Sequence, residues 1–357
     1  MIFNRYTNLL RKFASIIPSW SWTLLKGLIS IGLIVWLILD FDWNEVAVTL
    51  ARVSWLVIAG WLVIWAVAYC LMGLRLKVLL AAQKIEVDLF YSIQLVFIGA
   101  FTGNFMPSSM GGDAFKFVYL ARAGYGKSIT GASIVLDRLL NILAVFMFLP
   151  FALALPGLIN VDLLTENARL YWVIGIIILG GVLVVTGAIA ALRVRKLPLP
   201  LPSNRTLSAR LRRIIHRMVE IAVQWLDHPC ALILAMALSF VAISLCFVGG
   251  WVVAQGIGIE ISLESWLAIQ ACLSVLVFLP ISLNGLGLQE VSLVYFMSLV
   301  GVSEGKSQAL ALLLRVLIVL FSLFGVFGLI AEKRKISKPD GNESERLSTS
   351  IEPGDFS

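Results

Sequence analysis

Six ionisable residues lie in or beside long apolar stretches of this sequence. At the centre of a bilayer a charge costs on the order of 3 kcal/mol, so these side chains are expected to face an interior cavity. Lysine and arginine could bind a phosphate there, while the carboxylates could orient the cations or carry protons. The alternative is a set of purely structural ion pairs. The six are Asp113, Lys116, Asp137, Arg138, Glu290 and Arg315.

Two clusters of proline and glycine accompany these residues. Each cluster interrupts an apolar stretch and predicts a helix break, because proline lacks an N–H group and glycine favours non-helical angles. A helix that begins after such a break directs free backbone N–H groups towards an anion. The first cluster contains Asn104, Pro107, Gly111 and Gly112, and the second contains Pro280, Asn284, Gly285 and Gly287.

The two clusters resemble each other. Segment 105–112 aligns with segment 278–285 and keeps its phenylalanine, proline, serine and final glycine. After each segment comes a carboxylate, and 25 residues later an arginine. This pattern predicts an internal repeat with one potential ion pair in each half. The aligned residues are Asp113 with Glu290 and Arg138 with Arg315.

The elements that must position these residues are membrane helices. Of 357 residues, 60% are hydrophobic and only 14% are charged, whereas soluble domains contain about 25% charged residues. A helix that crosses a bilayer needs about 20 apolar residues, and several stretches without charge are that long. We therefore expect an all-α polytopic membrane protein. The stretches are 53–74, 89–112, 139–161, 170–192, 228–259 and 265–289.

Basic residues near helix ends predict the topology, because lysine and arginine stay on the cytoplasmic side. The stretch 89–113 is flanked by basic segments on both sides, so it should enter the membrane and return. The stretch 265–303 should do the same from the opposite face. The two re-entrant helical hairpins are thus oppositely oriented within an inverted repeat, the architecture typical of secondary transporters. The six predicted spans are 22–40, 54–73, 129–155, 170–192, 229–257 and 309–331.

The predicted organisation follows from this topology. A basic N-terminus, 1–21, precedes a first membrane repeat, 22–155, and a second one, 170–331. A basic loop at 193–228 and a polar tail at 332–357 complete the cytoplasmic side. The protein is expected in the cell inner (plasma) membrane with both termini in the cytoplasm. Within the loop, Arg193 to Arg217 should attract anionic lipids of the inner leaflet.

Other chemistry is not indicated. The four cysteines have no metal-binding spacing and the two histidines have no ligand pair, so neither a metal nor another cofactor is expected. Gly126-Lys127-Ser128 lacks the first glycine of a nucleotide-binding loop. Nucleic acid is not an expected partner, and association with further copies of the chain is left open. Arg75 and Lys77 lie near a predicted cytoplasmic helix end and are expected to extend towards the head groups.

At these residues the chain resembles the membrane region of lysylphosphatidylglycerol synthase and its stand-alone, flippase-like relatives. The resemblance covers about residues 20–331 and rests on Asn104-x-x-Pro107, Gly111-Gly112-Asp113-x-x-Lys116, Asp137-Arg138 and Pro280-x-Ser282-x-Asn284-Gly285-x-Gly287-x-x-Glu290. It implies movement of anionic or aminoacylated phospholipids, or of polyprenyl-linked glycolipids, across the bilayer. The family more often has arginine at the position of Lys116 and before the glutamate, where this chain has Gln289.

We therefore expect a lipid translocase that works by alternating access, without a catalytic residue and not as an enzyme. Two alternatives remain open: a membrane-embedded transferase that uses Asp113 and Asp137 on a lipid-linked substrate, and an accessory subunit of a glycosyltransferase or cell-envelope assembly system. The expected substrate-binding residues are Asn104, Pro107, Gly111, Gly112, Asp113, Lys116, Asp137, Arg138, Pro280, Asn284, Gly285, Gly287, Glu290 and Arg315.

Overall fold

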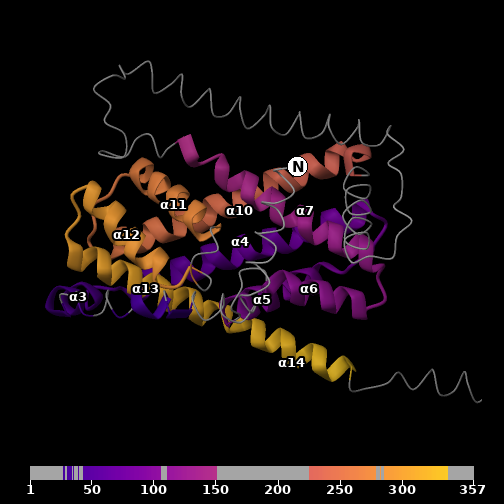
Figure 1. Cartoon of the computed structure of the whole chain (residues 1–357), viewed down its shortest axis with the longest axis horizontal. Helices are drawn as coiled ribbons and strands as arrows, with labels where there is room; N and C mark the ends of the chain where they lie inside the picture. The colour runs from indigo at the N-terminus through magenta and orange to yellow at the C-terminus, as the bar shows by residue number, and fades with distance from the viewer. Residues whose placement is uncertain are drawn as a thin grey trace, which may run out of the picture.

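The computed structural model describes residues 43–105, 111–150, 225–278 and 285–336, together with Ser282 and scattered positions between 27 and 39. This described part is helical and contains no strand, which confirms the all-α prediction. Figure 1 shows the helices packed side by side in one body. They are α3 (Trp43–Leu50), α4 (Trp55–Ala82), α5 (Leu89–Phe105), α6 (Gly111–Arg122), α7 (Lys127–Phe146), η2 (Trp225–Asp227), α10 (Pro229–Gly256), α11 (Leu263–Phe278), α12 (Leu288–Leu299), α13 (Glu304–Ser322) and α14 (Phe324–Ile336).

Four helical stretches are long and apolar enough to cross a membrane: α4, α7, α10 and the combined stretch Glu304–Ile330. At 1.5 Å per residue, the 28 residues of α4 extend over about 42 Å. Four of the predicted spans are thereby confirmed as long apolar helices. The predicted span 170–192 and most of 22–40 lie outside the described residues, as do the basic loop at 193–228 up to Gln224 and most of the tail.

The most extensive contact between described helices joins α4 to α10, and the two run antiparallel, because Gly256 meets Val57 while Gly249 meets Trp65. A Cβ atom on Gly256 would lie 2.5 Å from Val57, and one on Gly249 would lie 3.0 Å from Trp65. The absence of side chains at these two glycines lets the helices approach closely. Up to Arg75, α4 is apolar on all sides, as is α10, and both helices expose large side chains on their outer surface, such as Trp55 on α4. Such extensive exposed apolar surface is what a helix in contact with lipid presents.

Two pairs of shorter helices, α5 with α6 and α11 with α12, interrupt the series of long ones. Their breaks fall where the sequence predicts them, since α5 ends at Phe105 and α6 begins at Gly111. With 17 residues, α5 extends over about 25 Å, less than the bilayer core of about 30 Å. The short lengths fit re-entrant hairpins, and the re-entry itself stays a prediction.

Within the first pair the backbones touch. A Cβ atom on Gly112 would lie 2.2 Å from the carbonyl oxygen of Gly99, and one on Gly99 would lie 2.7 Å from the side chain of Lys116. No other residue type fits at Gly112 without displacing backbone. This glycine contact places the first turn of α6 directly against α5 and directs Lys116 along it.

The two halves of the chain contain the same series of helices. The lengths of α4, α5, α6 and α7 are 28, 17, 12 and 20 residues, and those of α10, α11, α12 and α13 are 28, 16, 12 and 19. Because the first helices of the two series run antiparallel, the second series is inverted relative to the first. The order and lengths of these helices fit the repeat predicted from the sequence.

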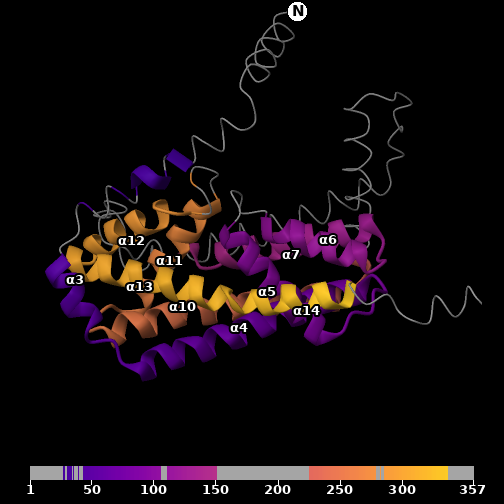
Figure 2. The same cartoon turned by 90° about the horizontal axis from the view of Figure 1, so that it is seen from below.

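After α13 the chain breaks at Leu323 and continues as α14, which packs on α5. Figure 2 shows the two helices nearly in line. A Cβ atom on Gly325 would lie 2.2 Å from the carbonyl oxygen of Phe97, and Gln94 Nε2 donates to the carbonyl of Gly328 at 2.8 Å. Near the break, Phe321 contacts the rings of Trp61 and Trp65 edge-on, and the aromatic packing joins α4 to α13.

Candidate functional site

Five charged side chains of the first repeat meet in one cluster. Arg75 comes from α4, Asp113 and Lys116 from α6, and Asp137 and Arg138 from α7. Arg75 Nε donates to Asp137 Oδ1 at 2.6 Å, and Arg138 Nη1 donates to Asp113 Oδ2 at 2.8 Å. The sequence prediction that Asp113 and Arg138 come together is confirmed.

Lys116 joins the two ion pairs. Its Nζ lies 3.4 Å from Asp113 Oδ1 and 3.7 Å from Asp137 Oδ2. The contact with Asp113 follows from helix geometry, because residues three apart lie on the same face. Asp113 stands in the first turn of α6, where the helix dipole favours a negative charge. Lys116 therefore ties α6 to α7.

These side chains line a cavity of about 250 Å³, which we call the first cavity. Arg75, Lys116 and Arg138 face it with Asp113 and Asp137, so three cations meet two carboxylates. With all five ionised, the described residues of the lining carry one net positive charge. Val96 of α5 and Val277 of α11 complete the wall, so the second repeat contributes to it. In a low-dielectric interior such a charge strongly favours an anion.

The position of Arg75 differs from the prediction. It was expected to extend towards the head groups, but it is only 2% exposed. The α4 helix continues past it to Ala82, and three acceptors engage the guanidinium: Asp137, Asn141 Oδ1 at 2.8 Å and Ser239 Oγ at 3.0 Å. The signal that could have identified Arg75 is Asp137, a carboxylate in an apolar helix to which the spacing of 25 residues assigns no arginine.

The second repeat forms its own ion pair between Glu290 of α12 and Arg315 of α13, as the sequence predicts. Arg315 Nη2 also donates to Gln289 Oε1 at 3.2 Å. The other oxygen of Glu290 accepts from the backbone N–H of Gly287 at 2.8 Å. Gly285 and Gly287 both have a φ of 78°, which glycine adopts readily. The carboxylate of Glu290 thus occupies the N-terminus of α12, where the sequence predicts backbone donors for an anion.

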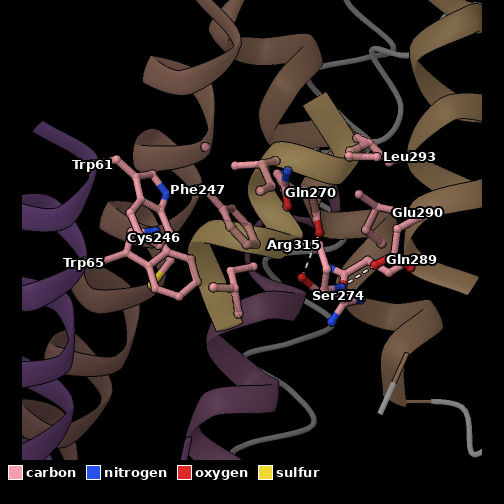
Figure 3. A pocket seen from close by; sticks show the side chains of 15 residues that line it. Trp61, Trp65, Cys246, Phe247, Gln270, Ser274, Gln289, Glu290, Leu293 and Arg315 are labelled. Atoms are coloured by element: carbon pink, nitrogen blue, oxygen red, sulfur yellow. Dashed lines mark hydrogen bonds and ion pairs between the residues drawn. The ribbon is translucent and has the colours of Figure 1, made fainter. Parts of the chain in front are cut away.

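A second cavity of about 190 Å³ adjoins this pair. Figure 3 shows Trp61 and Trp65 of α4 on one side of it and Glu290, Gln289 and Arg315 on the other. The two halves differ in charge here. The shift of 177 residues that takes Asp113 to Glu290 also takes Lys116 to Leu293 and Asp137 to Leu314. Among the described residues that line the second cavity, Glu290 and Arg315 are the charged ones, and their charges balance.

The remaining predicted site residues take other places. Gly111 and Gly112 are buried at the start of α6, where they set its approach to α5 rather than line the cavity. Asn104 is half-buried near the end of α5 and lines neither cavity. Pro107, Pro280 and Asn284 lie outside the described residues.

The long apolar helices and the paired inner charges define a multi-pass membrane protein. The chain belongs to the family described as the lysylphosphatidylglycerol synthase TM region, whose family model matches residues 23–325. This membership confirms the resemblance read from the sequence and assigns the chain to membrane proteins of lipid metabolism or translocation. No curated protein matches the chain.

Proposed function

We propose that the protein is a lipid translocase that moves a phosphate-bearing phospholipid or polyprenyl-linked glycolipid across the bilayer by alternating access. The observation that carries the proposal is the first cavity, with its net positive charge between helices of both repeats. A phosphodiester brings one negative charge, so its entry makes the cavity neutral. Charge-assisted hydrogen bonds from arginine and lysine to phosphate oxygens are among the strongest in proteins.

The size of the first cavity supports a head group as the ligand. At about 250 Å³ it is smaller than the 300–1,000 Å³ typical of sites for whole drug-sized molecules. A phosphate with a few further atoms fits that volume, while acyl or prenyl chains remain in the surrounding lipid. Arg138 is the most accessible of the three cations, with 26% of its side chain exposed, and would meet the phosphate first.

The pairing of the carboxylates favours translocation over a transferase. Asp113 is bound by Arg138 and Asp137 by Arg75, so each carboxylate already has a cationic partner. A transferase would need one of them free to accept a proton.

We place the protein in the cell inner (plasma) membrane with both termini in the cytoplasm, as the distribution of basic residues favours.

Reconstitution of the full chain in vesicles tests the proposal, with a fluorescent phosphatidylglycerol whose outer-leaflet fraction is quenched chemically. Arg138→Ala should slow exchange between leaflets at least tenfold, because a hydrogen bond to a charged group contributes about 1.5–3 kcal/mol. Arg122→Ala is the matched control, since it removes an exposed cation from α6 outside the cavity.

Exchange by the Arg138→Ala variant at the wild-type rate would refute the assignment of the first cavity. Covalent turnover of the lipid by the purified protein would support the transferase instead. Lipid exchange only when a glycosyltransferase is added would support the accessory subunit. Each of the three candidate functions thus predicts a different experimental outcome.

A further inference from the structure

The second cavity contains two polar groups without a partner. The indole Nε1 atoms of Trp61 and Trp65 are both buried and make no hydrogen bond within the described part of the chain. Trp61 itself is fully buried. A buried donor without an acceptor costs about 1–3 kcal/mol, so two on neighbouring turns of α4 call for an explanation. Both side chains line the cavity (Figure 3), and a shift of the indole rings towards it would let an acceptor bound there satisfy them.

The chemistry of the remaining lining limits what that acceptor can be. Arg315 is engaged by Glu290 and Gln289, so no net charge is offered to a phosphate. Glu290 is likewise engaged, so an ammonium group would meet no free carboxylate. The other polar lining groups are Gln270 and Ser274. Amides and indoles suit hydroxyl groups, because a hydroxyl both accepts and donates.

The two cavities are neighbours along α11 and α4. Along α11, Ser274 lines the second cavity and Val277 the first, and three helical residues correspond to about 4.5 Å. Along α4, Trp65 lines the second cavity and Met72 the first, which corresponds to about 10 Å. These two distances are comparable with the length of a phosphate joined to a ring.

We propose that the second cavity binds a neutral, hydroxyl-rich group, a sugar or polyol ring, on the lipid whose phosphate occupies the first cavity. This inference rests on the proposed function and narrows its substrate. It disfavours an aminoacylated head group, because the lining carboxylates Asp113, Asp137 and Glu290 are all paired with cations.

Binding of three lipids with identical acyl chains to the full chain in detergent tests the inference. Phosphatidylethanol supplies a phosphodiester without further polar groups, phosphatidylethanolamine adds an ammonium group, and phosphatidylinositol adds a neutral ring of hydroxyls. We expect phosphatidylinositol to bind about tenfold more tightly than phosphatidylethanol, from two added hydrogen bonds. Phosphatidylethanolamine should show no advantage.

Trp61→Phe and Trp65→Phe keep the ring and remove the donor. Each should weaken phosphatidylinositol binding roughly threefold and leave phosphatidylethanol unchanged. Trp251→Phe is the matched control, because that indole already donates to the carbonyl of Ile261 at 3.0 Å and lies outside the lining. Its effect on either lipid should be negligible.

Equal affinity for phosphatidylinositol and phosphatidylethanol would overturn the inference, as would a preference for phosphatidylinositol that both tryptophan variants retain. Higher affinity for phosphatidylethanolamine would overturn it in favour of a cationic head group. The proposed function fails separately, if Arg138→Ala leaves the affinity for phosphatidylethanol unchanged. The two failures therefore appear in different variants and different lipids.

Discussion

Replacement of Arg75 by methionine tests the architecture of the charged cluster. The guanidinium donates to Asp137 at 2.6 Å, Asn141 at 2.8 Å and Ser239 at 3.0 Å, and methionine fills similar space without any of these bonds. Loss of one partner from a buried ion pair costs about 3–5 kcal/mol, because the other charge stays buried. In the variant, Asp137 keeps a second cationic partner, because Lys116 Nζ lies 3.7 Å from its Oδ2 atom. We therefore expect the loss of unfolding free energy to lie near the lower end of that range.

The second substitution Asp137→Asn should recover most of that loss. The double variant removes both members of the pair, leaves no buried charge without a partner and keeps the net charge of the cluster. We expect it to be about 1 kcal/mol less stable than the wild type. Equilibrium unfolding of the purified chain in mixed detergent micelles, with the mole fraction of a denaturing detergent as the variable, measures the three free energies.

Lys77→Met is the control, because it removes a half-buried cation from the same helix that lines neither cavity. It should change stability by about 0.5 kcal/mol or less. If Arg75→Met costs no more than this control, the buried network does not exist as described. If the double variant is no more stable than Arg75→Met, the cost does not come from an uncompensated Asp137.

Three further predictions concern the hairpins, the second ion pair and the topology. Gly112→Ala should lower the unfolding free energy by about 3 kcal/mol, because its methyl group would meet the carbonyl oxygen of Gly99 at 2.2 Å. Gly60→Ala is the control, because Gly60 faces open space on α4; it should raise the unfolding free energy by up to about 1 kcal/mol. Glu290→Gln should cost about 2 kcal/mol in the same assay while the affinity for phosphatidylethanol, measured by titration, stays unchanged. Single cysteines can be placed at the exposed positions Glu86 and Glu260 on a cysteine-free background. An impermeant maleimide should label the first from the cytoplasmic side and the second from the outer side. Labelling from the opposite sides would show that the topology is the reverse of the predicted one.

The sequence by itself determined the class of protein and the ion pair of each repeat. Long stretches without charge require membrane helices, whatever their packing. The breaks around Pro107 and Pro280 are local, since proline and glycine act on the backbone where they stand. The spacing of 25 residues between carboxylate and arginine recurs in both halves, and a repeat is visible in the sequence without knowledge of any contact.

Only the tertiary structure decided what else joins those pairs. The acceptors of Arg75 come from residues 62, 66 and 164 positions away, on α7 and α10, and no local pattern selects them. The close contact of Gly112 with Gly99 and the unsatisfied indoles of Trp61 and Trp65 likewise depend on which helix faces which. Burial and hydrogen bonding are properties of neighbours in space, so a side chain that appears peripheral in the sequence can lie at the centre of a site.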